Sequence, residues 1–193
     1  MSADAIYLSQ LLMTRVSHDL AGMAGSVLNG IELFEEMNDP ETIALSKDSA
    51  KAFIARVKFY RAVLGLDGAF VNANEVKVLT DEFLRTYRKI TLDFKIKEAD
   101  AKTLRLAMLI AMVLTDTFTK GGVILMDNKD GLSIVAQGEN INFTPEIEEA
   151  LNGELSELSA KYAPALLCSF LLKFYKKKMT VDATRHVVTF KIV

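Results

Sequence analysis

The chain has 193 residues, 50% of them hydrophobic and 25% charged, which is the composition of a globular protein large enough to bury a core. Its net charge of −2 gives no basic field for a nucleic acid. The longest apolar run, residues 104–114, contains Arg105 and is too short for a bilayer, and the first residues lack a signal peptide's apolar stretch. We therefore expect a cytoplasmic protein that binds neither nucleic acid nor membrane, with Cys168 a reduced core residue.

Residues 5–37 predict a long helix, because apolar residues recur there at steps of three and four. The residues of this seam are Met13, Val16, Leu20, Met23, Val27, Ile31 and Phe34. At about 100° per residue, His18 points roughly 200° away from Val16 and so toward solvent. An exposed imidazole can act as a nucleophile near neutral pH, although many helical histidines are simply solvated.

Small and polar residues share the side of this helix that carries His18. Ala21, Gly22, Gly25 and Asn29 lie within roughly 60° of it. Each glycine inside a helix costs about 1 kcal/mol relative to alanine, so their presence favours close approach by a second surface. We expect a partner protein to lie on this strip. The alternative is that the glycines mark a break between two shorter helices.

Residues 38–40 (Asn-Asp-Pro) predict a turn and residues 41–66 a second helix. The apolar stripe of the second helix is Ala50, Phe53, Val57, Tyr60 and Leu64. Two helices joined by a short turn form an antiparallel hairpin. Because a hairpin alone buries little apolar surface, we expect two chains to form a four-helix bundle as a homodimer. The alternative is that the stripe packs on the C-terminal part of its own chain.

A glycine- and asparagine-containing linker at residues 65–74 divides the chain into expected domains 1–68 and 75–193. The second domain has a mixed pattern, with helices predicted over 75–87, 100–118 and 158–175, a short helix after Pro145, and strands at 90–94, 123–126, 132–136, 179–181 and 187–192. This order predicts an α/β sandwich with helices on one face of a mixed sheet, and an α+β chain overall. His186 is expected in a strand of the final hairpin.

His18-Asp19-Leu20, followed by small residues and residues 29–33 (Asn-Gly-Ile-Glu-Leu), resembles the phosphoacceptor helix of ChpT-like histidine phosphotransferases. These bacterial phosphorelay proteins are related to the dimerisation and ATP-binding domains of sensor histidine kinases. The resemblance implies that His18 is the phosphoacceptor and Asp19 its acidic neighbour, able to orient the imidazole. It also implies that response-regulator receiver domains donate and accept the phosphoryl group and supply Mg²⁺.

Three basic residues are candidates for contacts in such a transfer. Arg15, one turn before His18, could pair with the phosphoryl group, and a solvated surface arginine is an equal alternative. Lys51 and Lys58 share a strip on the second helix and could meet the acidic pocket of a receiver, although solvated charge is the more common explanation.

The order of elements after residue 75 resembles the GHKL (Bergerat-like) ATPase domain of histidine kinases, but its nucleotide-binding residues are replaced. Thr115 and Asp116 stand where the kinases have a Mg²⁺-binding asparagine, and residues 136–139 lack the aspartate that reads adenine. Residues 160–164 contain no glycine where backbone amides would cradle phosphates. We expect a degenerate domain that binds no ATP, with a weak surviving nucleotide site as the alternative. With two histidines in the chain, we expect no bound metal.

These patterns together predict a histidine phosphotransferase that shuttles a phosphoryl group through His18 between receiver domains. The alternative from another class is a non-catalytic scaffold that binds or sequesters a response regulator. An active histidine kinase is disfavoured by the missing glycine-rich loops.

Overall fold

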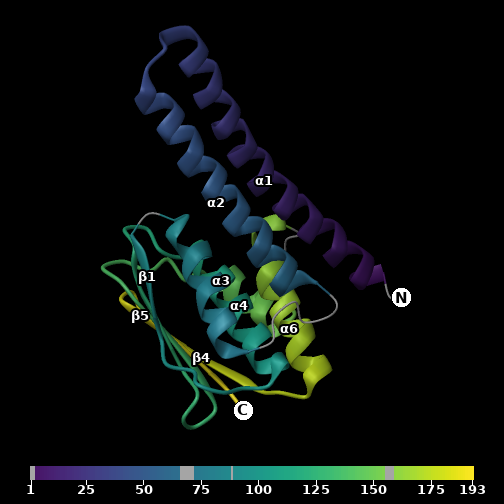
Figure 1. Cartoon of the computed structure of the whole chain (residues 1–193). Helices are drawn as coiled ribbons and strands as arrows, with labels where there is room; N and C mark the ends of the chain where they lie inside the picture. The colour runs from purple at the N-terminus through teal and green to yellow at the C-terminus, as the bar shows by residue number, and fades with distance from the viewer. Residues whose placement is uncertain (1–2, 66–71, 88, 155–158) are drawn as a thin grey trace.

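The computed structural model describes residues 3–65, 72–87, 89–154 and 159–193 (Figure 1). Two long antiparallel helices, α1 (Ala3–Met37) and α2 (Pro40–Leu64), form the predicted hairpin. The connection is tight because Asn38 adopts a positive φ of 50° and the Asp39 carboxylate accepts a 3.0 Å hydrogen bond from the Glu41 N–H. Pro40 then occupies the first turn of α2, where its missing N–H costs nothing. The predicted linker falls mostly on residues 66–71, outside the described residues.

The remaining chain forms a mixed sheet with helices. The elements in order are α3 (Ala73–Arg85), β1 (Ile90–Phe94), α4 (Ala101–Thr115), β2 (Gly122–Asp127), β3 (Leu132–Gln137), α5 (Pro145–Asn152), the 3₁₀ turn η1 (Ala160–Tyr162), α6 (Ala163–Tyr175), β4 (Met179–Ala183) and β5 (Val187–Ile192). The strand order is β1-β2-β3-β5-β4, with β1 parallel to β2 and the other pairs antiparallel. Figure 1 shows α3, α4 and α6 covering one face of this sheet, between it and the hairpin. The α/β layer arrangement predicted from the sequence is confirmed.

Several details of the elements differ from the sequence predictions. The single helix expected over 158–175 is a 3₁₀ turn followed by α6, because Pro164 lies in the first turn of α6 and cannot continue a helix from before it. The helix expected to reach residue 118 ends at Thr115, where the Thr117 N–H and hydroxyl both bond to the Leu114 carbonyl. His186 lies in the turn between β4 and β5 rather than in a strand.

One half of the hairpin packs on the sheet domain. Val16 and Leu20 of α1 contact its core, and Phe59 of α2 is fully buried with its ring stacked on Phe83 of α3 at 3.8 Å. The alternative in which the stripe packs on its own chain is therefore correct for this half. The hairpin extends well beyond the sheet domain (Figure 1), and exposed apolar residues occur along its outer surface.

No helix among the described residues is both long enough and apolar enough to cross a membrane. Within the same residues, no group of three or more His, Cys, Asp or Glu side chains is arranged to hold a metal ion. Cys168 is buried in α6, as expected, and burial raises the pKa of its thiol to about 12.

Candidate functional site

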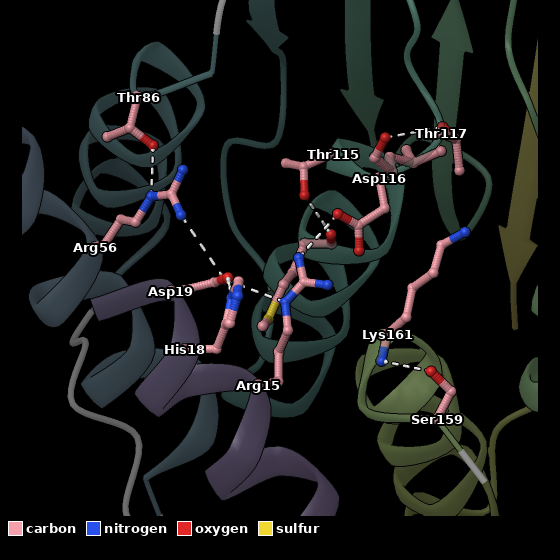
Figure 2. Close-up of polar contacts among 12 residues, drawn as sticks. Arg15, His18, Asp19, Arg56, Thr86, Thr115, Asp116, Thr117, Ser159 and Lys161 are labelled. Carbon is pink, nitrogen blue, oxygen red and sulfur yellow. Dashed lines mark hydrogen bonds and ion pairs between the residues drawn. The ribbon is translucent and has the colours of Figure 1, made fainter. Parts of the chain in front are cut away.

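His18 lies on the outer side of α1 with 88% of its side chain exposed, as the helical periodicity predicts. Its Nδ1 atom is 3.6 Å from Oδ1 of Asp19, the next residue (Figure 2). This separation is too long for a hydrogen bond, so the ring and the carboxylate are in electrostatic contact only. The carboxylate on the Nδ1 side favours a proton on that nitrogen and leaves Nε2 free to react.

The Asp19 carboxylate is held in place by side chains from both helices of the hairpin. Its Oδ2 atom accepts a 2.7 Å hydrogen bond from the Tyr60 hydroxyl and a 3.1 Å bond from Nε of Arg15. Nη1 of Arg56 lies 3.7 Å from the same oxygen. The Asp19 side chain is only 11% exposed, so these contacts are largely shielded from water. The low dielectric of such an environment strengthens hydrogen bonds and ion pairs. With Oδ2 engaged by these donors, Oδ1 faces His18.

Arg15 joins the hairpin to the sheet domain. While its Nε bonds to Asp19, its Nη2 donates a 2.8 Å hydrogen bond to Oδ1 of Asp116, the residue that ends α4 (Figure 2). Burial alone would lower the pKa of Arg15, but the hydrogen bond and charge of Asp116, with the charge of Asp19, outweigh burial and raise it. Arg15 is thus not the solvated surface arginine of the alternative reading. In the structure the guanidinium binds two carboxylates of its own chain, and a contact with the phosphoryl group stays a prediction.

Arg56 makes a second connection from the hairpin to the sheet domain. Its Nε donates a 3.0 Å hydrogen bond to the Thr86 hydroxyl at the end of α3, and its guanidinium lies 4.3 Å above the Tyr87 ring. Burial raises the pKa of Tyr87. Burial also raises the pKa of Tyr60, and the neighbouring Tyr87 and Asp19 raise it further. Tyr60 therefore stays protonated at neutral pH and remains a donor to the carboxylate.

The small-residue strip beside His18 is open. Ala21, Gly22 and Asn29 are exposed, and a Cβ atom added at Gly22 or Gly25 would meet no side chain or distant backbone within 4 Å. Helix α1 runs without interruption through both glycines, so the alternative of a helix break is wrong. Since internal packing requires neither glycine, their absent side chains leave a smooth surface next to the imidazole.

Lys51 and Lys58 lie elsewhere on the molecule. They line an open groove between α2 and α3 together with Ile54, Glu82 and Arg85, and no α1 residue contributes to it. Within one chain, the structure therefore does not bring these lysines together with His18.

The cavity beside Asp116 is small. Asp116 is bound to Arg15, and it borders, with Lys161 and Tyr162, a cavity of about 10 Å³. Pockets for drug-sized ligands are typically about 300–1,000 Å³. Gly121, with φ of 87°, sits where a Cβ would collide with the Lys89 carbonyl oxygen, so it serves the turn into β2.

The family model of the histidine phosphotransferase C-terminal domain matches residues 73–186, and the chain belongs to this family.

Among individual proteins, the chain is similar to protein phosphotransferase ChpT of Brucella abortus (strain 2308), with 23% identity over 198 residues, 96% of this chain and 95% of that protein. A solved structure of a bacterial phosphotransferase shares the fold along the whole chain, with a TM-score of 0.85 and 22% identity, covering 100% of this chain and 98% of the other. The chain is therefore similar to ChpT-like phosphotransferases over nearly its whole length.

Three residues of this network were not predicted from the sequence to belong to the site: Arg56, Tyr60 and Asp116. Asp116 is 101 positions from Arg15, and Tyr60 occupies a position in the apolar stripe of α2. A hydroxyl at one position of an otherwise apolar stripe was the signal for Tyr60, because a buried hydroxyl needs a polar partner. Asp116 was noted in the sequence only at the position of a kinase Mg²⁺-binding asparagine, which gives no sign of a contact with Arg15.

We predict that Tyr60→Phe lowers the free energy of unfolding by about 1.5–3 kcal/mol, because it removes a hydrogen bond to a mostly buried carboxylate. Urea denaturation at pH 7 measures the change. Tyr7→Phe, on the exposed start of α1, is the matched control and should shift the value by no more than about 0.5 kcal/mol.

The same pair of proteins gives a pH test. The unfolded chain releases the Tyr60 proton near pH 10, whereas the raised pKa keeps it on the folded chain at higher pH. The stability contributed by Tyr60 is therefore complete below about pH 9 and declines as pH rises above about 10. The parent's advantage over Tyr60→Phe should shrink in that alkaline window, and an advantage that grew there would contradict the assigned network.

Proposed function

We propose that this protein is a phosphorelay intermediate in which His18 accepts a phosphoryl group from one response-regulator receiver domain and passes it to another. The observation that carries the proposal is the pairing of an exposed imidazole with a carboxylate fixed by Arg15 and Tyr60. Membership of the histidine phosphotransferase family supports it. A binding scaffold would need the docking strip but not this arrangement around the ring.

The chemistry follows from the free Nε2 atom. Its lone pair attacks the phosphorus of the donor's aspartyl phosphate, so that an N–P bond forms while the P–O bond breaks and the electron pair leaves with the donor carboxylate. The proton on Nδ1 remains, and Asp19 lies beside the positive charge that the ring acquires. The second transfer reverses these bond changes on another receiver's aspartate. In-line positioning and charge neutralisation carry most of such a transfer, and the receivers would supply the Mg²⁺.

The strip formed by Ala21, Gly22, Gly25 and Asn29 is the proposed docking surface for both receivers. It lies on the same side of α1 as His18, and it contains no large side chain that would hold a partner away from the ring. The groove with Lys51 and Lys58 is an additional basic surface on α2, but it is not continuous with His18 in a single chain.

We further propose a homodimer in which two hairpins form a four-helix bundle. Ile6, Met13, Leu28 and Ile31 are exposed on α1, within roughly 60° of one another and at least roughly 80° from His18. Such an apolar stripe on a helix is stabilised when a second helix covers it. Because the stripe and His18 occupy different sides of α1, dimerisation leaves the imidazole accessible.

The C-terminal domain is proposed to be a degenerate GHKL ATPase domain that binds no ATP and acts as a support for the hairpin. The cavity of about 10 Å³ bordered by Asp116 and Lys161 supports this proposal. We place the protein in the cytoplasm with its receiver partners.

Replacing His18 by Ala is expected to abolish acid-labile labelling from ³²P-phosphorylated receiver domains without changing the melting temperature, because the side chain is 88% exposed. His186→Ala removes the chain's other histidine and is the control that should label normally. Normal labelling of the His18 variant would refute the assigned phosphoacceptor. Receiver binding without any labelling of the parent protein would favour the scaffold.

Gly25→Arg is expected to reduce receiver affinity and phosphotransfer at least about tenfold, because a long side chain would stand in the docking strip. The helix itself should be as stable or more stable, since arginine has the higher helix propensity. Gly25→Ala should change transfer much less. If the arginine variant binds receivers like the parent protein, as measured by titration calorimetry, the strip is not the docking surface.

Leu28→Glu is expected to convert a dimer to a monomer in light scattering at micromolar concentration, because it places a charge in the proposed bundle face. Leu33→Glu, at an exposed position on another side of α1, is the matched control and should remain dimeric. A parent protein with the mass of one chain would contradict the homodimer.

A further inference from the structure

Asp116 occupies an unfavourable position by the rules of helix electrostatics. It ends α4, where the helix dipole places partial negative charge, and a carboxylate there is destabilising. The 2.8 Å hydrogen bond from Arg15 offsets this effect. Its side chain is 19% exposed, so Asp116 forms a largely buried link between the sheet domain and the hairpin.

The link to His18 passes through one rigid group. A guanidinium is planar, so fixing Nη2 on Asp116 also fixes the direction of Nε, which bonds to Asp19. The second oxygen of Asp19 then lies 3.6 Å from Nδ1 of His18 (Figure 2). The chain of contacts from α4 to the imidazole therefore has three steps, and only its last residue, His18, is largely exposed to solvent.

Arg56 and Tyr60 hold Asp19 from the other helix, but neither replaces Asp116. Tyr60 approaches Oδ2 from α2, and Arg56 is itself bound to Thr86. Without Asp116, Arg15 would have one carboxylate in place of two and could rotate to take Oδ1 of Asp19 as well, which would neutralise the oxygen that faces His18.

We propose that Asp116 is a positioning residue for His18, acting through Arg15 and Asp19 to keep the proton on Nδ1 and Nε2 available. This inference rests on the proposed phosphoacceptor function of His18. It assigns the sheet domain a direct part in the transfer, beyond support of the hairpin, although Asp116 itself does not touch the phosphoryl group.

The test uses the full chain with ¹⁵N-labelled histidines. The two histidines give two sets of ring signals, and His186, whose Nδ1 lies 2.8 Å from the Glu139 carbonyl oxygen, is an internal reference. In the parent protein at pH 8, the His18 signals should show the Nδ1-protonated tautomer. Asp116→Asn should shift His18 toward the Nε2-protonated tautomer and leave His186 unchanged.

The same variant should lower the rate at which phosphoramidate, a small phosphoryl donor, labels His18 by about 10- to 100-fold. Asp116→Glu keeps the charge and should recover part of the rate. Asp93→Asn removes a half-buried carboxylate of β1, which is paired with Lys95, and should behave like the parent protein. If Asp116→Asn does not fold, Arg15→Lys tests the same link, because one ammonium group cannot bridge the two carboxylates as a guanidinium does.

An unchanged His18 tautomer and an unchanged labelling rate in a folded Asp116→Asn or Arg15→Lys protein would overturn the proposal. The tautomer measurement needs no receiver domain. A parent protein that exchanges no phosphoryl group with receivers would refute the proposed function, while the tautomer shift would still decide whether Asp116 positions the ring.

Discussion

The Arg15 guanidinium bonds to Asp19 on its own helix and to Asp116 at the end of α4, and these two contacts set how the hairpin sits on the sheet domain. A charge this far removed from water is costly unless its partners are in place, and removing one partner of a buried ion pair typically costs about 3–5 kcal/mol. The hairpin and the domain therefore have one favoured placement. The apolar contact between Phe59 and Phe83 stabilises the packing of the hairpin on the domain. It does not by itself determine their relative orientation, because the hydrophobic effect is not directional.

Helix α1 carries three groups of residues to which the proposed mechanism gives different roles. One side packs on α2 and the sheet domain through residues such as Val16 and Leu20, and it also carries Asp19 into the polar network. A second side carries His18 with the glycine strip, and a third carries the apolar stripe proposed for dimerisation. The long uninterrupted helix keeps these surfaces in fixed register. In the proposed complex, a receiver docked beside His18 meets an imidazole that is oriented by Asp19.

The sequence predicted those features that depend on local periodicity. The three- and four-residue steps placed His18 on the outside of α1, and the Asn-Asp-Pro turn placed the hairpin connection, because both follow from helix geometry and capping. The order of helices and strands along the chain also followed the expected alternation. Thr115 and Asp116 were identified as a departure from the kinase pattern, and Asp116 borders a cavity of only about 10 Å³.

Contacts between distant parts of the chain could not be predicted in the same way. Nothing near Arg15 indicates that its second partner lies 101 residues away, so the sequence left a phosphate contact and a solvated side chain as equal possibilities. The same limit applies to Lys51 and Lys58, whose shared strip on α2 is periodic but whose distance from His18 depends on how the helices pack. Gly25 and Gly30 look alike in sequence, yet only Gly30 allows close approach to another helix, at Ser46.

The most direct test of the account is the ³¹P NMR spectrum of the protein after incubation with a phosphorylated receiver domain, with the modified residue located by mass spectrometry. The account predicts one phosphoramidate signal from His18, with phosphorus on Nε2, since Nδ1 faces the Asp19 carboxylate. Phosphorus on Nδ1 of His18, or on any other residue, would contradict the account.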